Sequence, residues 1–165
     1  MKNNVLGLLF FSIVLLSACG DPVGEDLDHY INEELASIID LEEGVIMEYE
    51  SVVGSNYTND KDLYIHLEEV VLPMYLDFIE QLEAINPETS EIRELHEIYI
   101  SAVNTQYNAM VKLLGAIDYQ DHGMVSQSNQ MLSEGRAKIR EFHNEMDGLI
   151  EEYNVEFDIE MNDFE

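Results

Sequence analysis

Apolar residues recur along much of this chain at intervals of three and four positions, the spacing of amphipathic helices. The first run is Ile31, Leu35, Ile38, Val45, Tyr49 and Val52, with Glu42 at one position of the same face. It predicts one long helix that starts near Glu25. We expect that helix to end at Gly54-Ser55-Asn56, because glycine and asparagine commonly terminate helices.

Three further runs repeat the pattern. Asn59-Asp60 offers an N-cap for a second helix. The apolar stripe along one face of this helix, its seam, consists of Leu63, Leu67, Val70, Met74, Phe78 and Leu82. Pro73 lies inside that helix and should disturb it about one turn earlier, because proline lacks a backbone donor. A third seam runs from Ile92 to Ile117 and a fourth from Val125 to Tyr153, with a turn near 119–123 between them.

Four such segments with short connections predict an all-α fold, an antiparallel up-down-up-down four-helix bundle over residues 26–153. The remaining residues, 154–165, alternate apolar and acidic side chains with the period of a strand. We expect an acidic tail that is extended or disordered. It would either add to the sheet edge of a partner or fray along the bundle.

The first nineteen residues carry a different pattern. Lys2 is followed by an apolar stretch from Val5 to Leu16, and the segment ends in Leu16-Ser17-Ala18-Cys19, which contains the only cysteine of the chain. The stretch is short for a membrane span and is typical of a secretory signal peptide. It resembles the lipobox signal peptides of bacterial lipoproteins, and the resemblance covers this segment alone.

That resemblance implies that residues 1–18 are a signal peptide and that Cys19 becomes the lipidated first residue of the mature protein. A diacylglyceryl group, with palmitate as a typical acyl chain, would then anchor the protein to the extracytoplasmic face of the cell membrane. Residues 19–25 would be the lipidated cysteine and a flexible leash. With its one cysteine occupied, the domain would have no disulfide.

Acidic residues far outnumber basic residues in this chain. The chain has 35 Asp and Glu against seven Lys and Arg, a formal net charge of -28, and removal of residues 1–18 with Lys2 leaves -29. Nucleic acid is excluded as a partner, because phosphate binding needs clustered basic residues. The membrane is reached through lipid, and an envelope protein or a cationic peptide is the expected partner. Oligomeric state is left open.

No motif points to catalysis, a metal or another cofactor. The sequence has no Gly-x-Ser-x-Gly, no phosphate-binding loop and no His or Cys cluster with zinc spacing. His66 and Glu69 form one His-x-x-Glu pair, which we interpret as a solvated helix pair. We therefore expect a non-enzyme, with the covalent lipid on Cys19 as its only attached group.

Glu42 is the sharpest exception to the apolar seams, because a buried charge needs a partner. Two interpretations stay open. Glu42 could pair with Arg136 or Arg140 and fix the register of the helices. Alternatively, it could belong to a polar pocket in the middle of the bundle, with Gln106 and Tyr107 as contacts.

The sequence as a whole predicts a membrane-anchored extracytoplasmic lipoprotein that acts as a non-enzymatic binding or interaction module at the cell envelope. The alternative is a transport-associated accessory lipoprotein that binds a small ligand or a cation in the mid-bundle pocket.

Overall fold

The computed structural model describes residues 21–156, and this part of the chain is all helical with no strand. The predicted all-α class is confirmed. The elements in chain order are α1 (Pro22–His29), the π-helical segment η1 (Tyr30–Leu35), α2 (Ile39–Glu50), the short 3-10 helix η2 (Gly54–Asn56), α3 (Asp60–His66), the π-helical segment η3 (Leu67–Val71), α4 (Leu72–Ala84), α5 (Ser90–Tyr119) and α6 (His122–Tyr153).

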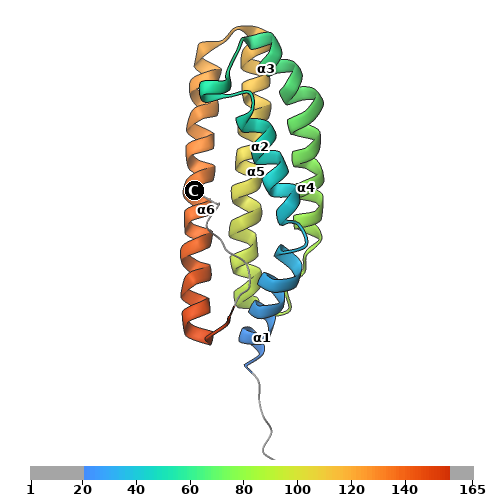
Figure 1. The fold of residues 1–165 in the computed structure, drawn as a ribbon. Helices are drawn as coiled ribbons and strands as arrows, with labels where there is room; N and C mark the ends of the chain where they lie inside the picture. Colours follow the sequence, from blue (N-terminus) through green and yellow to red (C-terminus); the bar gives the residue numbers. More distant parts are fainter. Residues whose placement is uncertain (1–20, 157–165) are drawn as a thin grey trace, which may run out of the picture.

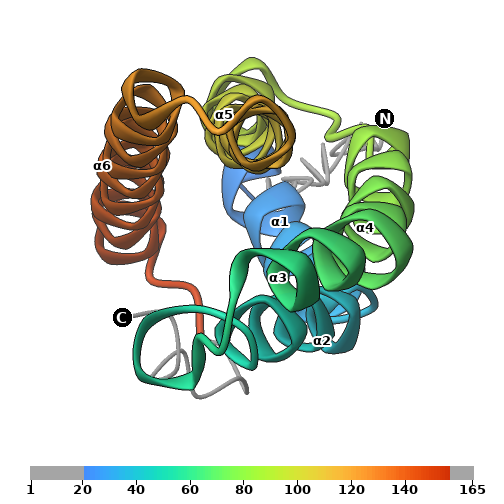
Figure 2. The same cartoon turned by 90° about the horizontal axis from the view of Figure 1, so that it is seen from above.

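The long helices lie side by side and give the molecule an elongated shape (Figure 1). Helices α5 and α6 are antiparallel neighbours, and α4 runs beside α5 on its other side. Seen along the rods, α6, α5 and α4 occupy successive corners, and α2 lies on the remaining side (Figure 2). The core forms between them, and its largest fully buried side chains include Tyr30, Phe78, Ile92 and Met146.

The first helical segment differs from the single helix that the sequence predicts. It begins at Pro22, because Asp21 accepts a hydrogen bond from the backbone N–H of Val23 and proline suits the first helical position. Residues 22–25 therefore belong to α1 and not to a leash. The segment is then interrupted between Leu35 and Ile39, where the Ser37 hydroxyl donates to the Glu34 carbonyl at 2.7 Å. Such a bond competes with regular helix hydrogen bonding.

The second segment begins as predicted and is disturbed where Pro73 requires it. Asn59 caps α3 by accepting from the backbone N–H of Asp62 at 3.0 Å. The π-helical turn η3 ends two residues before Pro73, so the irregular turn lies where proline cannot donate to the preceding carbonyl.

Helix α5 is held at its start by a side chain from α1. Asp26 accepts from the backbone N–H groups of Glu88 (3.1 Å) and Thr89 (2.7 Å) and from the Thr89 hydroxyl (2.6 Å). Burial alone would raise the pKa of Asp26, but these hydrogen bonds outweigh burial and lower it. The Asp26 carboxylate thus joins the first helix to the start of α5.

Helices α5 and α6 approach each other closely at Gly135. A Cβ atom at this position would lie 2.5 Å from Gln106 Cγ and 3.4 Å from the Ala102 carbonyl oxygen. About two turns earlier on α6, the buried Ser128 hydroxyl donates to the Ala109 carbonyl at 2.7 Å. A small residue and a satisfied hydroxyl therefore let these two long helices pack tightly.

The signal peptide, Cys19 and most of the tail expected at 154–165 lie outside the described residues. Within the described range, no helix is long and apolar enough to cross a membrane. Helix α6 ends at Asn154 in the left-handed conformation, and Asn32 of η1 then donates to the Glu156 carbonyl at 3.2 Å. The chain beyond α6 has therefore turned back toward the first segment by Glu156.

Candidate functional site

A pocket lies between the first helical segment and α6, with α5 behind it. Its volume is about 40 Å³, above the roughly 10–15 Å³ that one water molecule needs. From the first segment and α5, the lining side chains are Ile31, Leu35, Ile38, Ile39, Glu42 and Tyr99.

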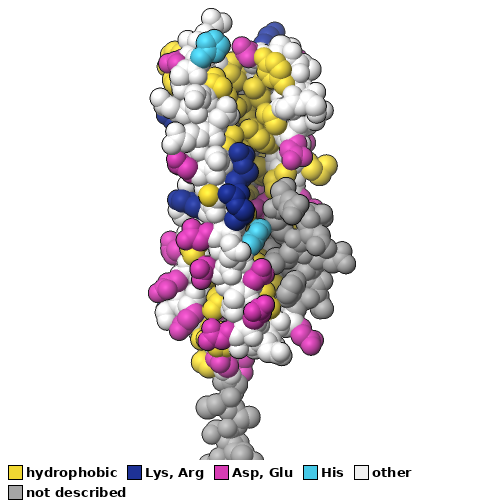
Figure 3. All heavy atoms as spheres, turned by 90° about the vertical axis from the view of Figure 1, so that its left-hand side faces the viewer, with side chains coloured by type: hydrophobic (Ala, Val, Ile, Leu, Met, Phe, Trp, Pro, Cys, Tyr) yellow, Lys and Arg dark blue, Asp and Glu magenta, His cyan; other side chains and the backbone are white. Residues whose placement is uncertain are grey.

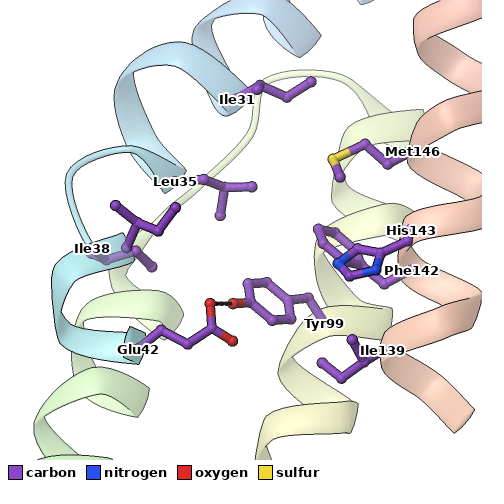
Figure 4. Close-up of a pocket in the computed structure, with 10 residues that line it drawn as sticks. Ile31, Leu35, Ile38, Glu42, Tyr99, Ile139, Phe142, His143 and Met146 are labelled. Carbon is purple, nitrogen blue, oxygen red and sulfur yellow. Dashed lines mark hydrogen bonds between the residues drawn. The ribbon is translucent and has the colours of Figure 1, made fainter. Parts of the chain in front are cut away.

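Helix α6 supplies the other wall through Ile139, Phe142, His143 and Met146. These four residues follow one another at intervals of three, one and three, so they share one face of the helix. Figure 4 shows them opposite Ile31, Leu35 and Ile38, with Glu42 and Tyr99 meeting between the two walls. The lining is mainly apolar, and its polar groups are a carboxyl, a phenol and an imidazole.

The polar centre of the pocket is a hydrogen bond between Glu42 of α2 and Tyr99 of α5. The Tyr99 hydroxyl donates to Glu42 Oε2 at 2.6 Å. The Tyr99 ring stacks on Phe142, with centroids 4.5 Å apart and planes 13° apart, so packing fixes the direction of the donor. Glu42 keeps partial solvent exposure, because it lines the pocket.

Burial raises the pKa of Glu42 to about 7, although the hydrogen bond from Tyr99 acts in the opposite direction. Burial also raises the pKa of the Tyr99 phenol well above its usual value, so Tyr99 remains a donor at neutral pH. The pKa of His143 is lowered by burial. Near neutral pH the Glu42 carboxyl therefore exchanges between a neutral form that can donate and an ionised form that only accepts.

The arginine pair that the sequence offered for Glu42 is not formed. All ion pairs recorded within residues 21–156 involve a histidine, and the partner of Glu42 is Tyr99. Arg136 and Arg140 are exposed on α6, and the charge of Arg136 acts on Tyr49 of α2. A buried phenol satisfies the carboxyl without the cost of desolvating a guanidinium.

Gln106 and Tyr107 belong to a different cluster. The Tyr75 hydroxyl donates to Gln106 Oε1 at 3.0 Å, and the Tyr107 and Tyr75 rings lie 5.9 Å apart. Neither Gln106 nor Tyr107 lines the pocket. The structure thus brings Glu42 to a pocket, as one interpretation required, but without the two neighbours that the sequence proposed.

Tyr99 and His143 are pocket residues that the sequence reasoning missed. Tyr99 falls within the third seam, between Ile92 and Ile117, and a tyrosine on a buried face needs a partner for its hydroxyl. That requirement was the available signal, and Glu42 was the seam residue able to meet it. His143 follows the fourth-seam residue Phe142 by one position and does not share the spacing of that seam, so the pattern gave no signal for it.

The histidines and acids do not gather into a metal centre in the described part of the chain. His66 contacts Glu48 of α2, with Nε2 2.8 Å from Glu48 Oε2, and not Glu69 of its own segment. The pair joins two helices at a partly exposed position.

Comparison with known proteins gives a family and no closer relative. No curated protein matches the chain, and no solved structure matches it. A family model described as EMYY-motif containing lipoprotein matches residues 1–163, nearly the whole chain. The match includes both the segment that ends at Cys19 and every helix described above. The chain therefore belongs to the family of EMYY-motif containing lipoproteins.

Proposed function

We propose that this lipoprotein is a non-enzymatic binding protein of the cell envelope that takes a small, largely apolar ligand into the pocket at Glu42 and Tyr99. Lipid on Cys19 anchors it at the extracytoplasmic face of the membrane. Four antiparallel rods, namely α1 with α2, α3 with α4, α5 and α6, form the scaffold in up-down-up-down order. Family membership supports the membrane-anchored envelope location.

The observation that carries the proposal is the composition of the pocket. Apolar side chains from η1, α2 and α6 surround one hydrogen-bonding centre, the Glu42 carboxyl. Small-molecule sites have this character, with apolar walls for affinity and a few placed polar groups for orientation. A slender apolar chain that ends in a hydroxyl or a similar polar group matches the lining.

The break between η1 and α2 lies at the pocket. Ile38 and Ile39 are lining residues, and the interruption falls immediately before Ile39. Residues 36–38 are not held by a continuous helix, so the wall that they form can shift more readily than the wall on α6. A pocket with one adjustable wall can widen for a ligand larger than its present volume.

Calorimetric titration with 1-decanol tests the proposal on the chain from residue 20 onward, which contains every described helix. We expect saturable binding by the wild type. Ile139→Trp should abolish it, because the indole would occupy the pocket from the α6 wall. Glu42→Leu should weaken it by removing the polar centre.

Val111→Trp is the matched control, since Val111 is exposed on α5 and does not line the pocket. Thermal unfolding of each variant establishes that it is folded. Equal binding of 1-decanol by wild type and by a folded Ile139→Trp variant would contradict the pocket as the ligand site.

A protein partner is the second candidate, and surface exposure at one end of the molecule favours it. Tyr119, at the end of α5, is 75% exposed, and Tyr57, between η2 and α3, is 45% exposed. The C-terminal end of α5 and the start of α3 lie at the end of the molecule opposite α1 (Figure 1). A photo-crosslinking residue at position 119 should then trap one defined envelope protein in cells, whereas the same group at Gln130 should not.

A further inference from the structure

The seven basic residues of this acidic chain are unevenly distributed. Three of them, Arg136, Lys138 and Arg140, lie within five positions of α6. Figure 3 shows basic side chains gathered midway along one face, with hydrophobic side chains above them and acidic ones below. A molecule with net charge -28 therefore carries one concentrated positive site.

In the described part of the chain, two of these three residues have no recorded hydrogen bond or ion pair. Lys138 donates to the hydroxyls of Ser101 (2.6 Å) and Thr105 (3.4 Å) on α5. Arg136 and Arg140 are exposed, and none of the ion pairs recorded in the described range includes them. Among the described residues, neither arginine has a recorded carboxylate partner, although the chain has 35 acidic residues.

The register of α6 places both arginines beside the pocket. Positions 136, 139, 140 and 143 follow the spacing of three and four that defines one helix face. Ile139 and His143 of this set line the pocket. Arg136 also lies near Tyr49 of α2, since its charge acts on that phenol. The arginines therefore border the groove between α2 and α6 at the end of the pocket farther from α1.

We propose that Arg136 and Arg140 bind the anionic headgroup of a single-chain amphiphile whose apolar chain enters the Glu42 pocket. This inference rests on the proposed function and names the ligand class for the same site. Two guanidinium groups one turn apart match the several acceptor oxygens of one carboxylate or phosphate, which arginine binds through paired N–H donors.

The position of the pocket along the molecule agrees with a ligand drawn from the membrane. Ile31 lies nine residues after the start of α1 at Pro22, which is about 14 Å at the rise of an α-helix. With Cys19 lipidated, the pocket would begin near the lipid surface. Fatty carboxylates and lipid phosphates both occur there as single-chain amphiphiles.

Four probes that share a decyl chain test the proposal by calorimetry below their micelle concentrations: 1-decanol, decanoate, decyl phosphate and decyltrimethylammonium. The overall charge of the protein favours the cation. Local binding by the arginines predicts the opposite order. We expect at least one of the two anions to bind about tenfold or more tightly than the cation, and the tighter anion identifies the headgroup class.

The double variant Arg136→Gln/Arg140→Gln should lose about tenfold or more of its affinity for the preferred anion, with 1-decanol binding changed by less than about twofold. Lys61→Gln/Lys112→Gln is the control, because it removes the same charge and neither lysine lines the pocket. This control should leave the preference for the anion intact.

Three outcomes overturn the proposal. One is equal or tighter binding of the cation, and another is an anion preference that survives in the double arginine variant. The third is anion binding that appears only when the chain is shortened to end at Glu156. That result would mean that the four acidic residues within 157–165 occupy the arginines in the longer chain. If 1-decanol still binds and Ile139→Trp blocks it, the proposed function stands while this inference fails. If none of the four probes binds, both fail.

Discussion

At the scale of single residues, the hydrogen bond between Glu42 and Tyr99 is the most consequential contact of the pocket. Glu42 would be costly as an unpaired charge in an apolar lining. The Tyr99 hydroxyl reduces that cost at a distance of 2.6 Å, yet the pKa of Glu42 is still raised to about 7. The carboxyl therefore makes stability depend on pH near neutrality.

Glu42→Gln tests that dependence. The pKa of Glu42 is about 7 in the folded state against 4.5 for an unperturbed glutamate, so the folded protein holds this proton more tightly. The stability from this group is complete below the unfolded pKa and is lost as pH rises through the folded pKa. Relative to wild type, the variant should gain up to about 3 kcal/mol between pH 4.5 and 8.

Urea unfolding at both pH values measures this difference. Glu50→Gln is the control, because Glu50 is exposed at the end of the same helix and is not among the groups that shift the pKa of Glu42. A wild-type and Glu42→Gln difference that stays constant with pH would show that the carboxyl is not perturbed.

Tyr99→Phe removes the donor and keeps the ring that stacks on Phe142. The ionised form of Glu42 loses more than the neutral form, so the pKa of Glu42 should rise further. The free energy of unfolding should fall by about 1–3 kcal/mol at pH 8 and by less at pH 5. NMR titration of the Glu42 carboxyl carbon reports the pKa directly.

Tyr107→Phe serves as the comparison for Tyr99→Phe, because the recorded contact of Tyr107 is the Tyr75 ring and not a hydrogen bond. An unchanged Glu42 titration in Tyr99→Phe would mean that the hydroxyl does not govern this carboxyl.

At the scale of secondary-structure elements, the sequence predicted where the helical segments lie. It did not predict where the first segment is interrupted. The seams placed α5, α6 and the start of α3 close to their observed bounds, because periodicity and the Asn59 cap are local features. The break before Ile39 and the π-helical segment η1 were not predicted. Neither irregularity has a periodic signature in the sequence.

Asp26→Ala should uncouple α1 from the start of α5. The carboxylate accepts three hydrogen bonds there, two from backbone N–H groups that would otherwise lack a partner. We expect a loss of about 2–3 kcal/mol in the free energy of unfolding at pH 7. Because the pKa of Asp26 is lowered, this stabilisation is present above about pH 4 and is lost as pH falls.

Chemical denaturation at pH 7 and pH 3 measures the effect of Asp26→Ala. Asp28→Ala is the control on the same helix, where the side chain is exposed and, within the described residues, has one recorded hydrogen bond, from Asn32. Equal losses for the two variants would argue against the bridge.

Gly135→Ala tests the close packing of α5 and α6. Alanine favours a helix over glycine by about 1 kcal/mol. At Gly135 the added Cβ would lie 2.5 Å from Gln106 Cγ, whose amide oxygen is held by Tyr75. We expect a net loss of about 1–3 kcal/mol in thermal stability.

Gly148→Ala is the matched substitution on the same helix, since nothing lies within 4 Å of its added Cβ. This variant should be stabilised by up to about 1 kcal/mol. Stabilisation by both alanines would show that the two helices tolerate a wider separation at Gly135.

At the scale of the whole molecule, charge repulsion opposes the packing of the core. The net charge is -28, and the ion pairs recorded for the described residues involve only His29 and His66. Few attractive pairs therefore offset the repulsion among carboxylates.

Sodium chloride should stabilise the fold for that reason. Raising the salt concentration from about 0.01 to 0.5 M shortens the range of repulsion from roughly 30 Å to below 8 Å. The unfolding midpoint at pH 7 should rise over this range by calorimetry. A midpoint that falls with salt would show that attractive pairs dominate the folded state.

The sequence by itself determined the helical class, the segments that bury apolar seams, the excess of acidic residues and the resemblance of the first nineteen residues to a lipobox. Each is a property of local spacing or composition, which no distant contact can change. It also identified Glu42 as a polar residue on a buried face, and so indicated a special position.

Only the tertiary structure decided what surrounds Glu42. Tyr99 is 57 residues away in sequence, and the α6 wall of the pocket lies about 100 residues away. The axial register and rotation of the helices, which the packing of all their side chains sets together, turned Tyr99 toward Glu42 and left Arg136 and Arg140 facing outward. Helical periodicity fixes which residues share a face, but not which faces meet.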